Sequence, residues 1–156
     1  NERSQHKNRA TAWSMLKAKI LAMEEAIRLV EAEGLEAVFA RHARHARACR
    51  AAVEALGLDC FAETPSNGLT AVRVPEGRDG QDVVKMLRER HGMRIAGGQE
   101  PMKGRLFRLG HMGHYADDDI RDLTAALGET LAELGWVEGA DTRDPVDAAL
   151  AETASP

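Results

Sequence analysis

Aromatic side chains, cysteines and long apolar runs are all scarce in this chain of 156 residues. Only 4% of the residues are aromatic although 44% are hydrophobic, so we expect a core of aliphatic side chains and alanine. The two cysteines, Cys49 and Cys60, indicate small buried side chains in a reducing, cytoplasmic compartment, and a disulfide between them is the minor alternative. No apolar run approaches the ~20 residues that span a bilayer, and no basic and apolar leader is found. We therefore expect neither a membrane protein nor a secreted one.

Acidic residues outnumber basic ones, and the net charge of −4 disfavours nucleic acid as the main partner. The charge is unevenly distributed, because residues 1–21 carry five basic residues and a single glutamate, which is a net charge of +4. Those basic residues are Arg3, Lys7, Arg9, Lys17 and Lys19. A weak contact between residues 1–21 and RNA phosphates is one interpretation. A solvated helix face is the other.

Apolar residues at spacings of 3, 4, 3, 4 and 3 predict a long amphipathic helix near the N-terminus. Ser4 is the expected N-cap, and Gly34 is the expected end of the helix. A seam of this kind can pack against its own domain or pair with another chain. The seam consists of Trp13, Leu16, Ile20, Met23, Ile27 and Val30.

The glycines, prolines and helix caps of the remaining sequence, with its apolar runs, predict an α+β fold. A small, mostly antiparallel sheet of three or four strands is covered by helices and preceded by the long N-terminal helix. Asp79 and Asp117 are the expected caps of two of these helices, and Gly92 and Gly135 their ends. In the helix over 35–56 we expect Phe39 and His42 to face the apolar side. The expected strands are 59–63, 69–74, 93–96 and 105–109, and the expected helices are 35–56, 79–91, 117–135 and a short one near 144–146.

The segment 93–113 is the most informative part of the sequence, because it places Arg108 between Leu106, Phe107 and Leu109. A charged side chain on an apolar strand is costly unless something pairs with it. A guanidinium suits a carboxylate, which it can hold by two parallel hydrogen bonds. The spacing leaves two interpretations open, a site for a small carboxylate and a structural salt bridge. His111, just after this strand, is a candidate for the mouth of such a site.

A series of short motifs extends over residues 22–135: Gly34-Leu35-Glu36, Arg41-His42, Leu56-Gly57-Leu58, Thr70-Ala71-Val72, Pro75, Gly97-Gly98-Gln99 and Phe107-Arg108-Leu109-Gly110-His111-Met112-Gly113. With these motifs, residues 22–135 resemble the C-terminal small domain of class V, fold-type I, pyridoxal-phosphate aminotransferases of the serine- or alanine-glyoxylate type. The resemblance implies transfer of an amino group from serine or alanine to glyoxylate or another 2-oxo acid, with Arg108 holding the substrate carboxylate.

In that family the cofactor lysine, the aspartate beneath the pyridine nitrogen and the phosphate pocket lie in a large N-terminal domain that this chain lacks. None of the five lysines, of which Lys85 and Lys103 fall within the matching region, has a context like that of the Schiff-base lysine. We therefore expect no cofactor in this fragment, no catalytic residue and no activity by the chain alone.

Residues 1–21 contain the string Arg3-Ser4-Gln5-His6-Lys7-Asn8, followed by Ala12 and Leu16-Lys17-Ala18-Lys19. With these residues the segment resembles the end of the catalytic domain of a bacterial class I peptide chain release factor, closest to type two. Release factors also contain Gly-Gly-Gln, but we interpret Gly97-Gly98-Gln99 as a turn before a strand. The two resemblances suggest a chimera with an acidic tail at 136–156. An engineered fusion, a shuffled sequence and a rearranged gene are all open, as are a translation-related RNA-binding role and no native function.

Two pairs of histidines at a spacing of three residues, His42 with His45 and His111 with His114, are candidate metal ligands. A structural zinc site needs four ligands, and the cysteines are poorly placed to complete one, so we expect no metal. A small domain without its large partner should expose apolar surface. We therefore expect that the chain can form a homo-oligomer.

Overall fold

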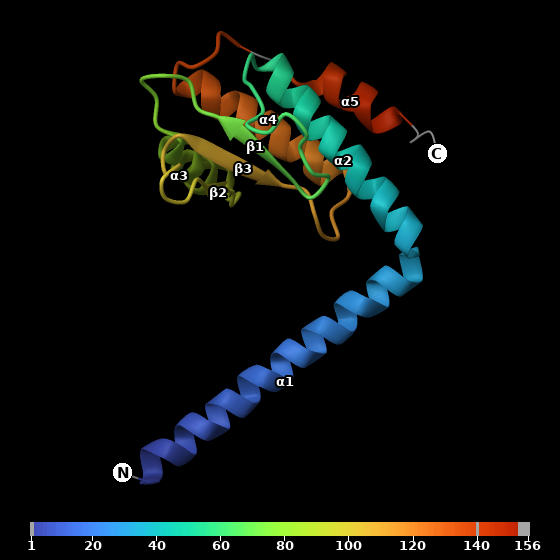
Figure 1. Cartoon of the computed structure of the whole chain (residues 1–156), viewed down its shortest axis with the longest axis vertical. Coiled ribbons are helices and arrows are strands. Elements are labelled where there is room, and N and C mark those ends of the chain that lie inside the picture. The colour runs from blue at the N-terminus through green and yellow to red at the C-terminus, as the bar shows by residue number, and fades with distance from the viewer. Residues whose placement is uncertain (1, 140, 153–156) are drawn as a thin grey trace. The chain divides into compact units, whose positions relative to one another are not determined.

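The computed structural model describes residues 2–139 and 141–152 (Figure 1). Within these residues it has five helices and three strands, which confirms the α+β prediction with a small antiparallel sheet and a long N-terminal helix. None of the described helices is both long and apolar enough to cross a bilayer. The elements are α1 (Glu2–Glu33), α2 (Leu35–Ala55), β1 (Leu69–Arg73), α3 (Gly80–His91), β2 (Ala96–Gly97), β3 (Leu106–Gly110), α4 (Asp117–Glu133) and α5 (Arg143–Ala151).

The chain divides into two compact units, residues 1–39 and residues 40–156. The first unit is α1 with the first turn of α2. Its helix ends where predicted, because Gly34 takes a left-handed φ of 85° while its N–H bonds to the Val30 carbonyl at 2.9 Å. The prediction that Ser4 is the N-cap is wrong, since the helix already includes Glu2.

The sheet of the second unit has the strand order β1-β3-β2, and both pairings are antiparallel. The predicted strand 59–63 is reduced to a single bridge between Cys60 and Val72. The N–H of Phe61 bonds to the Ala71 carbonyl at 2.8 Å, so this segment lies along the outer edge of β1. The predicted strand 93–96 is also shorter than expected, because only Ala96–Gly97 pairs with β3.

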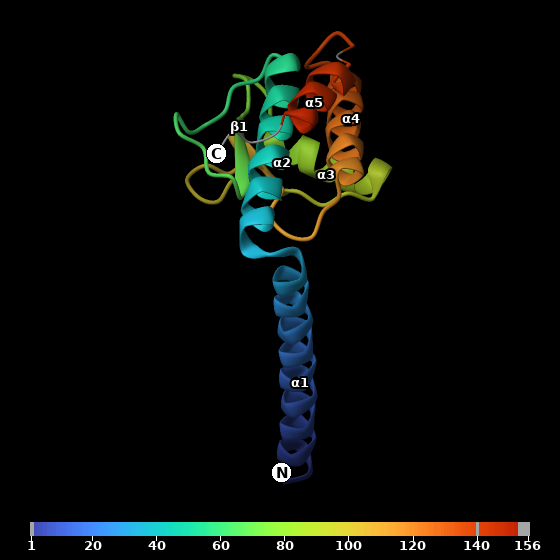
Figure 2. The same cartoon turned by 90° about the vertical axis from the view of Figure 1, so that its right-hand side faces the viewer.

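One face of the sheet is buried beneath helices. Val72, Phe107 and Leu109 on this face are fully buried and pack with apolar side chains of α2, α3, α4 and α5. Figure 2 shows α2, α4 and α5 gathered beside the sheet. Helix α5 belongs to this core through Val146 and Leu150. Part of the segment 136–156 is therefore a packed helix.

Some of the predicted helix ends are confirmed, and others differ from the observed ends by one residue or more. Asp79 is the N-cap of α3, where its Oδ1 accepts the Gln81 N–H at 2.9 Å, and Gly92 ends the helix with a φ of 68°. Asp117 is the first helical residue of α4 and not its cap, because Ala116 holds that position. The N–H of Ala116 bonds to Asp119 Oδ2 at 2.7 Å.

The buried face of α2 differs from the expected one. His45 is fully buried, whereas His42 is only half-buried. Phe39, which the sequence pattern places on the apolar side, is 56% exposed. The apolar pattern of the sequence does not reveal that His45 occupies a core position of α2. His45 can be buried because Asp117, at the start of α4, accepts a hydrogen bond from its ring.

Candidate carboxylate site

Arg108 lies at the centre of β3, the middle strand of the sheet. Side chains alternate between the two faces of a strand, so the burial of Phe107 and Leu109 places Arg108 on the opposite face. The sequence correctly placed Arg108 in a strand with buried neighbours, but the arginine itself lies on the opposite face from Phe107 and Leu109 and is only half-buried. The guanidinium therefore avoids the cost of the apolar core.

Both cross-strand neighbours of Arg108 are alanines, Ala71 on β1 and Ala96 on β2. Directly opposed side chains in a sheet have Cβ atoms about 5 Å apart, so two methyl groups leave the arginine uncrowded. Arg108 Nε donates to the Gly97 carbonyl at 3.1 Å, which holds the base of the guanidinium. Among the described residues Arg108 forms no ion pair, so the alternative of a structural salt bridge finds no support there.

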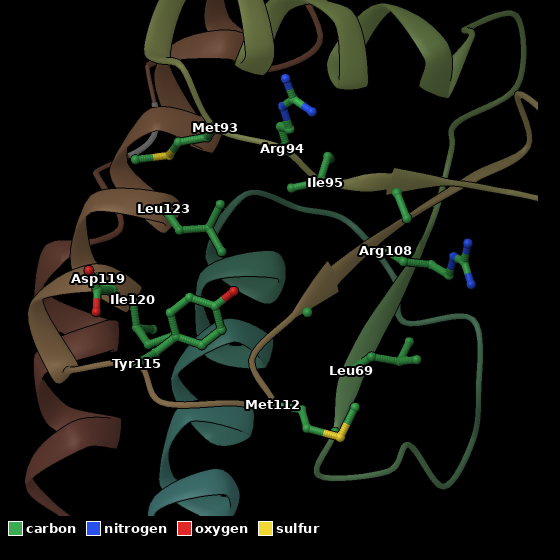
Figure 3. Close-up of a pocket in the computed structure, with 13 residues that line it drawn as sticks. Leu69, Met93, Arg94, Ile95, Arg108, Met112, Tyr115, Asp119, Ile120 and Leu123 are labelled. Carbon is green, nitrogen blue, oxygen red and sulfur yellow. The ribbon is translucent and has the colours of Figure 1, made fainter. Parts of the chain in front are cut away.

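A pocket of about 490 Å³ opens on this face of the second unit (Figure 3). It combines one arginine held by the sheet with walls that are largely apolar. Arg94, the Tyr115 ring and the Asp119 carboxylate add further polar groups. The remaining lining residues are Gly68, Leu69, Met93, Ile95, Ala96, Gly110, Met112, Ile120 and Leu123.

His111 is fully buried and does not line this pocket. Its Nδ1 lies 3.1 Å from the Asn67 carbonyl, and its Nε2 lies 3.0 Å from Thr70 Oγ1. The carbonyl can only accept, so Nδ1 carries the proton and Nε2 accepts from the threonine hydroxyl. Burial lowers the pKa of His111 to about 4. The ring is thus neutral and fully bonded, and it has no nitrogen left for a substrate.

Four side chains of α2 hold the loop between β3 and α4. Arg41 donates to the Gly113 carbonyl at 2.6 Å, and His42 Nε2 lies 3.2 Å from the N and O atoms of the same residue. One turn further on, Arg44 and His45 both reach Asp117 Oδ1, at 2.8 Å and 2.9 Å. The loop that follows the Arg108 strand is therefore fixed to the helix behind the sheet.

The contact of Arg44 and His45 with Asp117 shifts the pKa values of the groups involved. Burial opposes ionisation of Asp117, but the hydrogen bonds from Arg44 and His45 outweigh it and lower the pKa of the carboxyl. Burial also lowers the pKa of His45, against the opposing effect of Asp117. Sequence reasoning missed this contact. The repeated Arg-His at 41–42 and 44–45, three residues apart on one helix, was the signal that could have indicated it.

Gly97-Gly98-Gln99 ends β2 and begins the loop to β3, which agrees with the interpretation as a turn. A Cβ atom on Gly98 would lie 2.1 Å from the Met102 carbonyl oxygen, so the loop needs glycine there. Among the described residues, no three histidine, cysteine, aspartate or glutamate side chains come together as metal ligands. His42 and His45 bind different partners, at Gly113 and Asp117.

No family model matches the chain, but individual proteins do. Homologues of this chain are class V aminotransferases, of the serine- or alanine-glyoxylate type. The L-aspartate–glyoxylate aminotransferase of Paracoccus denitrificans is 41% identical over 107 residues, which are 67% of this chain and 27% of that protein. A relative named as the small subunit of a soluble hydrogenase, from Synechococcus sp. strain PCC 6716, is 41% identical over 117 residues, 74% of this chain and 30% of its own.

The solved structures agree with these relatives. The ureidoglycine–glyoxylate aminotransferase of Bacillus subtilis superposes with a TM-score of 0.73 at 33% identity, over 83% of this chain and 34% of that one. The chain thus spans about 30% of the length of the curated relatives it matches.

Proposed function

We propose that the unit 40–156 is the substrate-carboxylate-binding part of a pyridoxal-phosphate aminotransferase. On this proposal Arg108 binds the α-carboxylate of an amino acid and of its 2-oxo acid, with glyoxylate as one acceptor. The observation that carries the proposal is the setting of Arg108, an arginine between two alanines in the open pocket without an ion pair among the described residues. The similarity to glyoxylate aminotransferases supports it.

The geometry suits a carboxylate for a specific reason. The bond from Nε to Gly97 fixes the base of the guanidinium, and the terminal amino groups remain available to donate. Two such donors match the two oxygens of a carboxylate. The apolar walls of the pocket suit a short aliphatic side chain. His111 then acts as a positioning residue, because it ties the segment after the strand to Asn67 and Thr70.

The chain does not by itself suit the cofactor. Pyridoxal phosphate supplies the electron sink for amino transfer when it is held on a lysine. Among the described residues no lysine lines the Arg108 pocket, and Lys85 lines a different pocket of about 270 Å³ between α3 and α4. We therefore propose that this unit provides the carboxylate clamp, and that it is inactive alone. The chain mixed with pyridoxal phosphate and then borohydride should retain no stoichiometric cofactor on a lysine.

Carboxylate binding is the direct test of the clamp. We expect pyruvate and glyoxylate to shift the amide resonances of Gly97 and Leu109 in ¹H–¹⁵N spectra, saturating in the millimolar range because half a site binds weakly. Arg108→Gln should weaken this binding at least about tenfold, since it removes the charge-assisted pair of hydrogen bonds. Arg108→Lys should restore part of it, because the charge returns without the planar geometry.

Arg94→Gln is the matched control, because Arg94 also lines the pocket but is exposed and lies outside the paired strands. It should leave the binding within about twofold of the unchanged chain. Equal losses in the two variants, or shifts that never saturate, would mean that Arg108 is not a specific carboxylate ligand.

A second candidate function rests on α1. Its basic side chains Lys7, Arg9, Lys17 and Lys19 are exposed, as an RNA-contacting helix requires. On this candidate, which would fit a release-factor-like segment joined to an aminotransferase-like one, the helix binds RNA phosphates. The binding should fall steeply with salt and vanish when residues 1–21 are removed. Salt-independent binding, or binding that survives the deletion, would refute it.

A further inference from the structure

The apolar seam of α1 has no cover within its own unit. Its six side chains remain between 40% and 63% exposed, although the helix runs for 32 residues. An exposed apolar strip of this length indicates an interaction surface. The first turn of α2 is the only other part of this unit among the described residues, and it is too short to cover the seam.

The spacing of the seam follows the heptad of a two-stranded coiled coil without interruption. Trp13, Ile20 and Ile27 occupy one core position, and Leu16, Met23 and Val30 occupy the other. An ordinary surface helix has a wider stripe with a period of 3.6 residues. Apolar residues that repeat strictly at spacings of three and four form a narrower stripe, which a single further helix can cover.

The charges along α1 select the orientation of the partner. Within the helix, residues 10–21 carry Lys17 and Lys19, a net charge of +2, whereas residues 22–33 hold four glutamates and only Arg28, a net charge of −3. Parallel pairing of two copies would place like-charged halves together. Antiparallel pairing places the basic half of each copy beside the acidic half of the other.

We infer that α1 pairs with the α1 of a second copy of this chain as an antiparallel coiled coil, centred between residues 21 and 22. In this register Trp13 faces the partner's Val30, and Ile20 faces the partner's Met23. Each large apolar side chain of one seam then meets an apolar side chain of the other. This inference does not depend on the function of the Arg108 pocket.

The same register brings Lys17 beside the partner's Glu24, and by symmetry Glu24 beside the partner's Lys17. Both side chains are exposed next to the seam, where coiled coils place the ion pairs that set orientation. A parallel pair would instead bring Lys19 close to the partner's Glu24. Lys17 and Glu24 therefore distinguish the two arrangements.

The size of the interface predicts a weak dimer. The helices overlap over roughly 24 residues, or ~36 Å, and helices about 10–12 Å wide then bury roughly 800 Å² in total. This is below the ~1,200 Å² at which stable interfaces begin. We therefore expect a monomer–dimer equilibrium in the micromolar range that weakens as salt rises, because salt screens the complementary halves.

Sedimentation equilibrium of the full chain over a range of concentrations tests this dimer. Ile20→Gln should raise the dissociation constant at least about tenfold, because it puts an amide into the centre of the seam. The matched control is Leu21→Gln, which changes the neighbouring residue on another side of the helix, where it is 64% exposed. It should leave the equilibrium unchanged. Circular dichroism verifies that both variants remain helical.

Charge reversal provides the test of orientation. Lys17→Glu and Glu24→Lys should each weaken the dimer several-fold, and the double variant should restore it, because the two residues meet only across the antiparallel interface. A chain that stays monomeric at every concentration would overturn the inference. So would equal effects of Ile20→Gln and Leu21→Gln, a double variant without rescue, or a dimer that tightens with salt.

Discussion

Single residues in this protein differ in role according to the face of the element that holds them. Arg108 and Phe107 are neighbours in β3, but one is directed to the open pocket and the other to the core. His111 and His114 show the same contrast, since His111 is fully buried and His114 is exposed. Burial with two hydrogen bonds keeps His111 neutral, which gives stability a dependence on pH.

His111 should make the fold less stable in acid. Its pKa is about 4 in the folded chain and near 6.5 when exposed, so above pH 6.5 neither state is protonated and stability is complete. As pH falls from 6.5 towards 4, the unfolded state takes up a proton that the folded state does not, and stability is lost. Urea denaturation should show a fall on the order of 2 kcal/mol between pH 7 and pH 4.5.

His111→Gln should reduce this fall, although the variant is less stable at pH 7. The exposed His114→Gln should keep the slope of the unchanged chain. His45, whose pKa is also lowered by burial, contributes in the same direction and accounts for a remaining slope in His111→Gln. An unaltered slope in His111→Gln would show that this histidine is not the source.

At the scale of elements, α2 organises the region around the pocket. It packs behind the sheet and holds the loop after β3 through Arg41, His42, Arg44 and His45. The contacts end on Gly113 and on Asp117, the first residue of α4. One helix therefore holds both the loop after the Arg108 strand and the first residue of the next helix.

Asp117→Ala should destabilise the second unit by on the order of 1–2 kcal/mol. The substitution removes the acceptor of two hydrogen bonds and leaves the fully buried His45 without its partner, while the 35% exposure of the Asp117 side chain limits the loss. Asp118→Ala is the control, because that side chain is 88% exposed and pairs only with Arg121 among the described residues. Chemical denaturation should show little change for Asp118→Ala. Equal losses in the two variants would argue against the contact.

At the scale of the whole molecule, the core comes from the second unit. The buried side chains of the core cluster all lie between residues 48 and 150, whereas the six apolar residues of the α1 seam are exposed. A helix with an exposed seam gains little stability by itself, since most helical stability in proteins comes from packing.

A chain lacking residues 1–33 should therefore keep its fold. At low protein concentration its free energy of unfolding should lie within about 1 kcal/mol of the full chain, because no core contact is removed. Urea denaturation followed by circular dichroism measures this value. A larger loss would show that α1 packs against the second unit.

Local patterns were sufficient to predict most elements. The heptad spacing and Gly34 predicted α1 and its end, the side chain of Asp79 predicted the start of α3, and the apolar run around Arg108 predicted β3. Each of these depends on residues close in sequence, such as a cap, a left-handed glycine or an alternating strand. The α+β class followed from their order.

Long-range packing decided the rest. The segment 59–63 lies along the edge of β1 through backbone hydrogen bonds at Asp59 and Phe61. It forms a bridge at Cys60 and not a full strand. His45 is buried because Asp117, 72 residues away, accepts its hydrogen bond. Arg108 stands in an open pocket because its side chain lies on the face of β3 opposite Phe107 and Leu109, which the core buries. By itself the sequence determined most of the helices and strands and singled out Arg108 as a candidate carboxylate ligand, since residue type and local spacing are written in it. Which of them meet, and which face solvent, depended on contacts between distant segments that only the tertiary structure brings together.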